Sequence, residues 1–553
     1  MSQQWKRRKM MAMKAKSTKT SQKKVIEISE EYKENIRNNS YLGKKGYTIL
    51  RSVISEDDQK ILYDELNVKP VTIGPVYNAS ADEGAFPVYR ENAKKIYIPR
   101  FYGIKRYGLP NRSEITEGED INVSFPKPLR DYQDKIVDVY MNHVKNPVCV
   151  GSEKIGNGGI LEVPCGRGKT VMALKIISLV QKKTLIIVHK EFLMNQWIDR
   201  ANEFLPGARI GKIQGPVFDV EGKDIVIGML QTLYDRALPE NAFDCFGLTI
   251  IDEVHRIGSE QFSKTLLRVV SPNMLGISAT VDRKDKLTCV LYMFIGPKIY
   301  TEERKDEDPV CVRSVEYIAA DPQFNETETD FRGQTKYSTM ISKLCGFGPR
   351  SDFIVKILSD LLVESKENNN EAQIMVLAHN RCILKYFYEA ITHKGFATVG
   401  YYVGGMKQAD LQETEYKQIV LATYAMAAEA LDIKSLSILL MATPKTDITQ
   451  SVGRILRVRH DNPVVVDIVD RHEIFQNQWT KRRRFYKKCN YRIVATDSIR
   501  YKGMNIDWKT DKTWNRVFDP KIHKHNNDNE GTGGNPILQK KCLINISTLD
   551  IES

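Results

Sequence analysis

Residues 159–180, GILEVPCGRGKTVMALKIISLV, decide the first expectation about the fold. Their apolar start predicts a strand over 159–163, and the apolar residues that follow at helical spacing predict a helix over 170–180. Glycines in the connection let the backbone curl so that its N–H groups face an anion, and the helix N-terminus adds its positive end. The stretch therefore predicts a phosphate-binding P-loop, in which Lys169 reaches the β- and γ-phosphates and the Thr170 hydroxyl contacts Mg²⁺.

The connecting loop departs from the general pattern G-x-x-x-x-G-K-[ST], because Val163 stands at the first glycine position. Gly166 is an inner glycine that still allows the loop to turn. The alternative is a glycine-rich strand–helix turn with a chance Lys-Thr pair. We expect the whole loop to bind the nucleotide, through Val163, Pro164, Cys165, Gly166, Arg167, Gly168, Lys169 and Thr170.

A second motif, LTIIDEVH at 248–255, follows about 80 residues after the P-loop. Its apolar run predicts a strand that delivers Asp252 to the carboxyl edge of a parallel sheet, where ligands of α/β proteins bind. Asp252 would hold the metal, directly or through water, and Glu253 would polarise the attacking water. An Asp-Glu pair after a strand can also be a helix N-cap, but its combination with the P-loop favours a nucleotide-hydrolysing site.

Buried apolar strands alternate with amphipathic helices along most of the chain, which predicts parallel βαβ units and an α/β fold. The alternation restarts after a charged connector at 302–308. We therefore expect two α/β lobes in tandem. The expected parts of the chain are a basic arm at 1–24, an accessory domain at 25–125, a first lobe at 126–300, a second lobe at 308–500 and a C-terminal extension at 501–553.

Charge and cysteine usage narrow the class of protein. The 553 residues include 82 Lys and Arg against 69 Asp and Glu, and residues 1–24 contain nine basic side chains and no acid. A basic tail suggests a polyanion partner, with nucleic acid before anionic membrane, although a solvated disordered tail explains it equally well. The nine cysteines form no Cys-x-x-Cys pair, so neither a disulfide framework nor structural zinc is expected. Reduced thiols, and therefore an intracellular protein, are expected instead. No apolar run reaches the ~18 residues of a membrane span.

Three further motifs carry a family resemblance. DEVH at 252–255 is a DExH box, SAT at 278–280 is a Ser-Ala-Thr motif, and QSVGRILR at 450–457 matches Q-x-x-G-R-x-x-R. With the P-loop, these resemble the superfamily 2 helicases and translocases. Within that superfamily the chain looks most like the XPB and phage UvsW group. Over its whole length it also resembles the transcript-release helicases of poxviruses and other large DNA viruses. The marks of that group include LRDYQ at 129–133, the pair Gln196-Trp197 and GISAT at 276–280.

The resemblance implies two RecA-like parallel-sheet lobes with a small N-terminal accessory domain. It also implies site residues on both lobes. Arg454 and Arg457 would act as arginine fingers beside Gln450, and Gln133 would read adenine. Asp432 would contact the nucleotide, in a motif where Ala430 replaces the usual glycine. The coupling residues would be His255, Ser278 and Thr280, and the nucleic-acid contacts His189, Lys190, Gln196, Gln231, Thr232 and Thr423.

A basic run with interleaved aromatics, KRRRFYKK at 481–488, is a further candidate for phosphate contact. Arg482 and Arg483 are its predicted nucleic-acid contacts. The alternative is a solvated, charged helix surface.

The expected function is that of an ATP- and Mg²⁺-dependent motor. It would couple ATP hydrolysis between the lobes to movement along DNA, in viral transcription termination, transcript release or repair. If the protein is viral, the virion and the host cytoplasm are its expected locations. Two alternatives stay open at this point. One is an RNA helicase, and the other is a non-catalytic nucleic-acid-binding subunit of a transcription or repair complex, against which the intact P-loop and DExH box argue.

Overall fold

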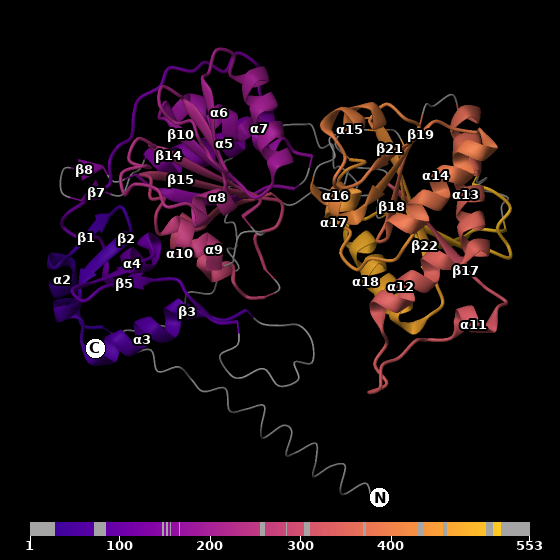
Figure 1. The fold of residues 1–553 in the computed structure, drawn as a ribbon, viewed down its shortest axis with the longest axis horizontal. Coiled ribbons are helices and arrows are strands. Elements are labelled where there is room, and N and C mark those ends of the chain that lie inside the picture. The colour runs from indigo at the N-terminus through magenta and orange to yellow at the C-terminus, as the bar shows by residue number, and fades with distance from the viewer. Residues whose placement is uncertain are drawn as a thin grey trace, which may run out of the picture.

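The fold consists of two large α/β lobes and a smaller N-terminal domain that packs against the first lobe (Figure 1). The computed structural model describes residues 28–70, 84–145, 149–150, 153–154, 156–164, 166–254, 260–283, 285–302, 310–368, 372–429, 433, 435–456, 460, 462–504 and 512–520. The predicted basic arm at 1–24 lies outside these residues. Within the described part of the chain, no helix is long and apolar enough to cross a membrane.

The N-terminal domain is a small antiparallel sheet with three helices. The strand order is β1-β2-β6-β5, with β1 at Ser40–Gly43, β2 at Gly46–Leu50, β6 at Lys95–Ile98 and β5 at Arg90–Glu91. The helices are α2 (Glu30–Asn38), α3 (Glu56–Leu66) and α4 (Arg100–Tyr107), and a hairpin pairs β3 (Asn67–Val68) with β4 (Phe86–Pro87). Ser29 and Ser55 begin α2 and α3, because each side chain accepts a hydrogen bond from a first-turn N–H.

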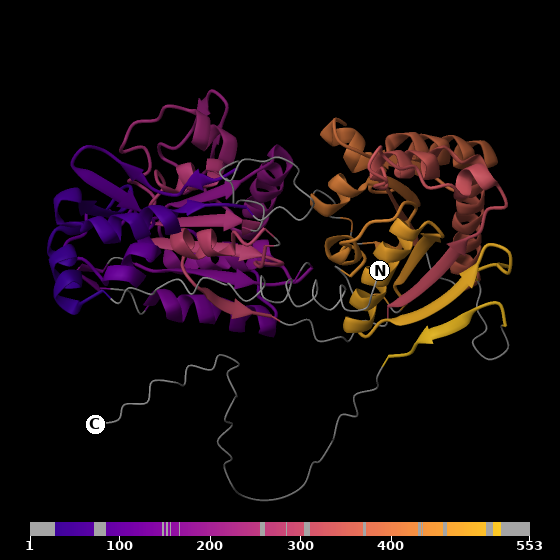
Figure 2. The ribbon, with the colours of Figure 1, turned by 90° about the horizontal axis from the view of Figure 1, so that it is seen from below.

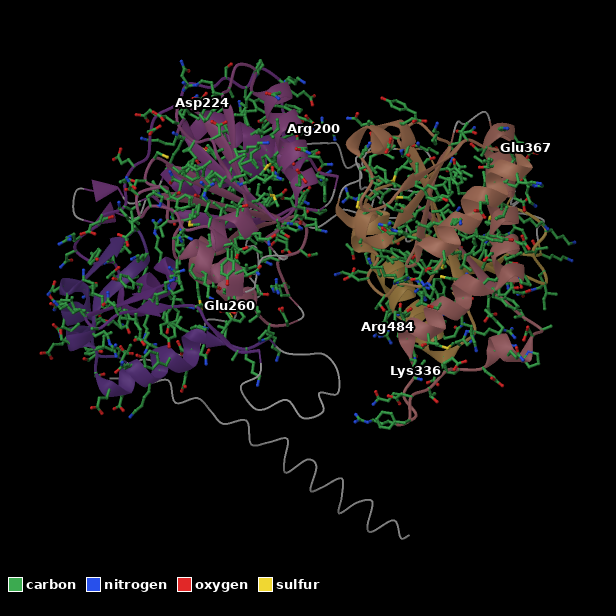
Figure 3. The ribbon with its side chains drawn as sticks, in the orientation of Figure 1. Arg200, Asp224, Glu260, Lys336, Glu367 and Arg484 are labelled. Carbon is green, nitrogen blue, oxygen red and sulfur yellow. The ribbon has the colours of Figure 1, made fainter. Side chains whose placement is uncertain are left out.

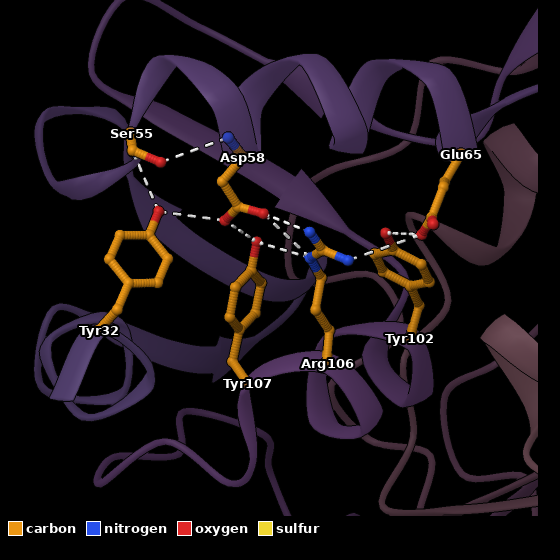
Figure 4. Close-up of polar contacts among 7 residues, drawn as sticks. All are labelled: Tyr32, Ser55, Asp58, Glu65, Tyr102, Arg106 and Tyr107. Carbon is orange, nitrogen blue, oxygen red and sulfur yellow. Dashed lines mark hydrogen bonds and ion pairs between the residues drawn. The ribbon is translucent and has the colours of Figure 1, made fainter. Parts of the chain in front are cut away.

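A buried carboxylate joins the three helices of this domain (Figure 4). Asp58 on α3 is 4% exposed and accepts hydrogen bonds from the hydroxyls of Tyr32 on α2, at 3.1 Å, and Tyr107 on α4, at 2.6 Å. It also forms an ion pair with Arg106 on α4. Burial raises the pKa of Tyr107 above its ordinary value, so this hydroxyl stays protonated and can donate. The network therefore fixes how α2, α3 and α4 pack.

We predict that Asp58→Ala lowers the free energy of unfolding by about 3–5 kcal/mol, because it removes the nearer carboxylate partner of Arg106, leaving only Glu65, and takes the acceptor from the hydroxyls of Tyr32 and Tyr107. Urea denaturation followed by circular dichroism measures the change. Asp57→Ala is the matched control, since the Asp57 side chain is 82% exposed on the same helix. Its expected cost is about 1 kcal/mol or less. Equal losses in the two variants would contradict a structural role for the network.

The N-terminal domain is bound to the first lobe by a buried arginine and a shared core. Arg100 is 2% exposed and donates to the carbonyl oxygens of Ser271 at 3.1 Å, Pro272 at 3.0 Å and Gly156 at 3.0 Å. Apolar side chains of the domain and of the first lobe pack in one continuous cluster. Burial lowers the pKa of Arg100 to about 10. The domain is therefore expected to move with the first lobe as one body.

The first lobe is built on an eight-stranded sheet with the order β12-β11-β13-β10-β14-β15-β9-β16. Every neighbouring pair is parallel except β11–β12. The strands are β9 (Gly158–Glu162), β10 (Thr184–Val188), β11 (Ile210–Gln214), β12 (Val217–Phe218), β13 (Ile225–Met229), β14 (Leu248–Asp252), β15 (Asn273–Ser278) and β16 (Lys298–Thr301). A separate short hairpin joins β7 (Cys149–Val150) and β8 (Glu153–Lys154).

Helices cover both faces of this sheet. One face packs under α5 (Asp131–Lys145), α6 (Lys169–Val180) and α7 (Glu191–Phe204), and the other under α8 (Leu230–Asp235), α9 (Glu260–Leu266) and α10 (Thr288–Ile295). Successive residues of one strand alternate between the two cores, as Ile186 and Ile187 of β10 do. Burial on both faces explains why the strands are continuous apolar runs in the sequence.

The second lobe repeats this plan of a sheet with helices packed around it (Figure 2). Its strand order is β19-β20-β18-β21-β22-β17-β23-β24. The strands are β17 (Cys311–Tyr317), β18 (Gln373–Ala378), β19 (Val399–Tyr402), β20 (Ile419–Thr423), β21 (Leu436–Met441), β22 (Val464–Asp470), β23 (Arg492–Asp497) and β24 (Asn515–Phe518). One face packs under α12 (Tyr337–Gly346), α13 (Gly348–Glu367) and α14 (Arg381–Lys394). The other helices are α11 (Pro322–Asn325), α15 (Gln408–Thr414), α16 (Tyr424–Glu429), α17 (Thr449–Val452) and α18 (Glu473–Lys488).

The expected α/β fold with two parallel-sheet lobes is confirmed. The second lobe extends beyond its expected end at residue 500, because β24 pairs with β23 in an antiparallel register. Tyr501, Met504 and Trp514 also contribute to the core of that lobe. Part of the segment expected as a C-terminal extension thus belongs to the sheet and core of the second lobe.

Candidate active site

The carboxyl ends of β9, β14 and β15 meet at one edge of the first sheet. Asp252 at the end of β14 is in register with Ile277 of β15, and Ser278 of β15 is in register with Glu162 of β9. The P-loop leaves β9 directly after Glu162. The two predicted halves of the nucleotide site, which are far apart in the sequence, therefore lie at the same edge of the sheet.

Two glycines shape the P-loop. Gly166 and Gly168 have φ angles of +82° and +79°, a region that favours glycine. A Cβ atom on Gly168 would also lie 2.3 Å from Nε2 of Gln133. That amide donates a 3.0 Å hydrogen bond to the carbonyl of Arg167, and so supports the loop from α5. The predicted contact between Gln133 and adenine stays a prediction, while the support of the loop is a role that the sequence did not reveal.

The charged groups of the site are Lys169, directly after the P-loop, and the two acids at the end of β14. Lys169, the first residue of α6, places its Nζ 3.6 Å from Oε1 of Glu253. Asp252 is 8% exposed and accepts a 3.0 Å hydrogen bond from the indole Nε1 of Trp197. Burial, and then the charge of Glu253, raise the pKa of Asp252 to about 6. The site therefore holds two adjacent carboxylates that a cation would stabilise.

Glu253 has a φ of +52°, which is uncommon for a residue with a side chain. Such backbone strain costs of order 1–3 kcal/mol and is concentrated at functional sites. Here the left-handed backbone follows directly after the end of β14 at Asp252.

The chemistry of these side chains fits Mg²⁺ bound together with phosphates. Within the described residues, no three His, Cys, Asp or Glu side chains come together as a metal site. Mg²⁺ is usually bound through one or two carboxylates, with phosphates and waters completing its shell. The buried carboxylate of Asp252, and the hydroxyl of Thr170 in the first turn of α6, are donors of the kind this ion takes.

The Ser-Ala-Thr motif is bonded directly to the P-loop. The N–H of Val163 donates to the carbonyl of Ser278 at 2.8 Å. The Ser278 hydroxyl donates to the carbonyl of Thr280 at 2.7 Å and accepts from its N–H at 3.3 Å. A displacement of the P-loop would therefore reach the segment after β15. His255, the third predicted coupling residue, lies outside the described residues.

Several contacts that the sequence did not predict also support this site. Arg167 forms an ion pair with Glu302 and lies 3.7 Å from the ring centre of Tyr132. The carboxylate of Glu162 accepts from the N–H of Val281 at 2.9 Å. Their partners are distant in the chain, so no local pattern marks them. Trp197 belonged to a motif that the sequence did mark, but its acceptor could not be inferred from that motif.

The described part of the second lobe includes Arg454, which is 7% exposed and follows α17. Arg457, Asp432 and the side chain of Gln450 lie outside the described residues, as does Cys165 of the P-loop. The structure therefore describes one of the two predicted arginine fingers.

The predicted nucleic-acid contacts of the first lobe follow neighbouring strands. Val188 of β10 and Met229 of β13 are in register, so His189 and Lys190 leave the sheet beside the start of α8, which carries Gln231 and Thr232. Gln231 is exposed, whereas the Thr232 hydroxyl accepts a 2.9 Å hydrogen bond from the N–H of Gly215. Gln196 lies half-buried on α7, and Thr423 ends β20 of the second lobe. Their contacts with nucleic acid stay predictions.

The prediction that Arg482 contacts nucleic acid is wrong. Its side chain is fully buried, with Nε 2.8 Å from Asp467 Oδ2 and Nη1 2.9 Å from the carbonyl of Lys445. At about 100° per residue the basic run winds around α18, and position 482 shares the buried face with Phe475 and Tyr486. Arg483 is exposed, so its prediction stands untested.

Comparisons with known proteins identify the family. A family model described as the res subunit of type III restriction enzymes matches residues 126–283. A protein of Acanthamoeba polyphaga mimivirus, named as a candidate ATP-dependent RNA helicase, is 31% identical over 522 residues, which are 91% of this chain and 97% of the relative. An XPB-type DNA 3′–5′ translocase of Sulfurisphaera tokodaii is 31% identical over 211 residues, 36% of this chain and 43% of the relative. The crystal structure of T4 UvsW covers 80% of this chain and 96% of its own, at 19% identity and a TM-score of 0.32.

The match to the mimivirus relative extends over nearly the whole of both chains, so it includes the N-terminal domain and both lobes. The family model covers the P-loop, the DExH box and the Ser-Ala-Thr motif of the first lobe. Both agree with the RecA-like plan of the two sheets and with the charged groups at the edge of β9 and β14. The chain belongs to the superfamily 2 DExH-box helicases, and it is an ATP-hydrolysing enzyme.

Proposed function

We propose that the protein is a motor that moves along DNA by hydrolysing ATP between its two lobes. The observation that carries this proposal is the convergence of Lys169, Asp252 and Glu253 at the carboxyl edge of the first sheet. DNA is favoured by the resemblance to XPB and UvsW, and the XPB-type relative is named as a DNA translocase. Release of transcripts or repair, within a larger complex, is the proposed process. If the chain is viral, like its mimivirus relative, it would act in the virion and the host cytoplasm.

The proposed chemistry depends on charge placement. Lys169 lies close to Glu253, but a triphosphate carries more negative charge than one carboxylate. Arrival of ATP would therefore draw Lys169 to the β- and γ-phosphates and free Glu253 to accept a proton from the attacking water. Mg²⁺ held by Asp252 and Thr170 would neutralise charge on the phosphates.

Movement requires that hydrolysis depend on the closure of the two lobes. Arg454 and Arg457 belong to the second lobe, whereas the P-loop belongs to the first. ATP would therefore bind the closed arrangement more tightly than the open one, and this difference in affinity can do mechanical work. A strand held by both lobes would advance as they close and reopen.

The experiment that tests this function is an ATPase assay of the full chain with single-stranded DNA, duplex DNA and RNA. A strand-displacement assay on substrates with either overhang accompanies it. We expect strong stimulation by DNA. Stimulation by RNA alone would select the second candidate, an RNA helicase, which the name of the mimivirus relative favours. Equal turnover with and without polymer would contradict the motor.

The exposed face of α18 is a proposed phosphate-binding surface on the second lobe (Figure 3, where Arg484 is labelled). Five exposed cations lie in its last two turns, and among the described residues none of them forms an ion pair; they are Lys481, Arg483, Arg484, Lys487 and Lys488. Contacts with phosphates release counterions, so each contact adds about 0.7–0.9 to the salt dependence of binding.

We predict that replacing Arg483, Arg484 and Lys488 together by Gln weakens DNA binding and lowers the slope of log K against log salt by about 2–3. Fluorescence anisotropy at several salt concentrations measures that slope. The control variant removes the same charge from exposed lysines on α13 and α14, at Lys356, Lys366 and Lys394. Equal slopes for the two variants would mean that the exposed cations of α18 do not contact phosphates and are only solvated.

A further inference from the structure

The strongest unassigned feature near the site is the buried indole of Trp197. It lies on α7 and is 2% exposed, among the apolar side chains that pack α7 against the sheet, which include Leu193, Met194 and Ala201. A buried indole N–H needs an acceptor, because leaving a polar group unpaired in an apolar core costs free energy. The acceptor here is Oδ2 of Asp252, at 3.0 Å, on a strand 55 residues later in the chain.

This hydrogen bond restricts the orientation of the Asp252 carboxylate. One of its oxygens, Oδ2, is held by the indole N–H, so the carboxylate cannot rotate without losing that bond. Both partners are held in place, since the indole is buried in the core beneath α7 and the carboxylate belongs to the last residue of β14. Such a group, bonded to a metal-holding carboxylate, sets the geometry and basicity of that ligand.

The helix that carries Trp197 also links several parts of the motor. Gln196, the preceding residue, is a predicted nucleic-acid contact. Phe192, one turn earlier, packs against the apolar core of the second lobe as well as that of the first. Helix α7 therefore contacts both lobes and, through Trp197, also contacts the Asp252 carboxylate of the nucleotide site.

We propose that Trp197 is a positioning residue that holds Asp252 in the orientation that binds the metal of the metal–nucleotide complex. The proposal rests on the proposed role of Asp252 as the metal-holding residue. Trp197 itself contacts neither the metal nor the nucleotide. It acts through one hydrogen bond, so removal of the N–H should affect metal affinity and spare the binding of the nucleotide itself.

The test compares Trp197→Phe with Trp514→Phe in the full chain. Trp514 is the matched control, because it is 6% exposed in the core of the second lobe and its indole nitrogen makes no hydrogen bond within the described residues. The direct readout is Mn²⁺ binding to the protein–ADP complex, followed by electron paramagnetic resonance. For Trp197→Phe we expect metal affinity to fall about 10–100-fold. The affinity for ADP without metal should stay within about twofold, and Trp514→Phe should change neither.

Steady-state kinetics give a second readout that a purely structural role would not produce. The Mg²⁺ concentration for half-maximal ATPase should rise by the same factor as the loss of Mn²⁺ affinity, and excess Mg²⁺ should restore most of kcat. If Trp197→Phe does not fold, benzothienylalanine introduced at position 197 keeps the shape of the indole and lacks its N–H. An unchanged metal affinity with either replacement would overturn the proposal.

Asp252→Ala separates the two levels of the argument. If this variant loses metal affinity while removal of the Trp197 N–H does not, the positioning role is wrong and the metal site stands. If Asp252→Ala itself leaves Mn²⁺ binding unchanged, the proposed metal site is wrong, and the positioning role fails with it.

Discussion

Glu253→Gln is expected to bind ATP with unchanged affinity and to hydrolyse it about 10²–10⁴-fold more slowly. The amide has nearly the size of the carboxylate, so the shape of the site is retained. It cannot accept a proton from water, and it removes the negative charge that lies 3.6 Å from Lys169. The loss should therefore appear in kcat, measured at saturating ATP, Mg²⁺ and DNA, and not in the binding of a fluorescent ATP analogue.

A matched control exists on the same lobe. Glu260→Gln removes an equal charge from α9, where Glu260 is exposed and pairs with Lys264 at 2.6 Å. We expect turnover within about twofold of the unaltered protein, since surface ion pairs contribute little. If Glu253→Gln retained more than a tenth of the original turnover, another group would have to accept the proton, and the proposed role of Glu253 would be wrong.

The first lobe shows how far local sequence patterns predict structure. β9 lies within one residue of the strand predicted at 159–163, α6 ends with the helix predicted at 170–180, and β14 covers the apolar run before the DExH box. The reason is physical, because strands buried on both faces and helices with one apolar face leave distinct periodicities. The P-loop and DExH residues could also be placed, since a strand's carboxyl end fixes where they emerge.

The residues that the sequence misplaced or missed depend on long-range partners. The basic run around Arg482 suggested phosphate contact, yet Arg482 pairs with Asp467 on β22 inside the lobe. Helical spacing from Phe475 would have assigned position 482 to the buried face, so the signal was present but outweighed by charge. Trp197 and Asp252, and likewise Arg167 and Glu302, come together only when the sheet assembles. No local pattern contains those pairs.

The N-terminal domain illustrates the same limit. Its helix α3 begins after a serine that is followed by three acids, a local pattern typical of a helix N-terminus, and the Ser55 cap is present. The buried network around Asp58 was not expected, because Asp58 looks like one more acid of a first turn. Arg100 attaches the domain to three carbonyl oxygens. No sequence pattern predicts these contacts, because every residue has a backbone carbonyl that can accept a hydrogen bond.

Arg454→Ala is expected to lower kcat by about 10³–10⁵, the range found for arginine fingers in other nucleotide hydrolases. A finger stabilises charge on the transferring phosphoryl group in the transition state and contributes little to ground-state binding. ATP affinity, set mainly by the P-loop of the first lobe, should therefore stay within a few fold. Arg454→Lys keeps the charge but loses the planar fork of donors, so it should recover only part of the rate.

Burial of Arg454 complicates this experiment, because loss of a 7% exposed side chain can also loosen the second lobe. Thermal unfolding and DNA affinity of both variants separate the two effects. If the variant unfolds at the original temperature and binds DNA normally but has lost most of its kcat, the loss is catalytic. Arg454 is then a group that the second lobe donates to the nucleotide site across the cleft. Weaker ATP binding with an unchanged kcat would instead assign Arg454 to nucleotide capture, and the coupling of hydrolysis to lobe closure would need another residue.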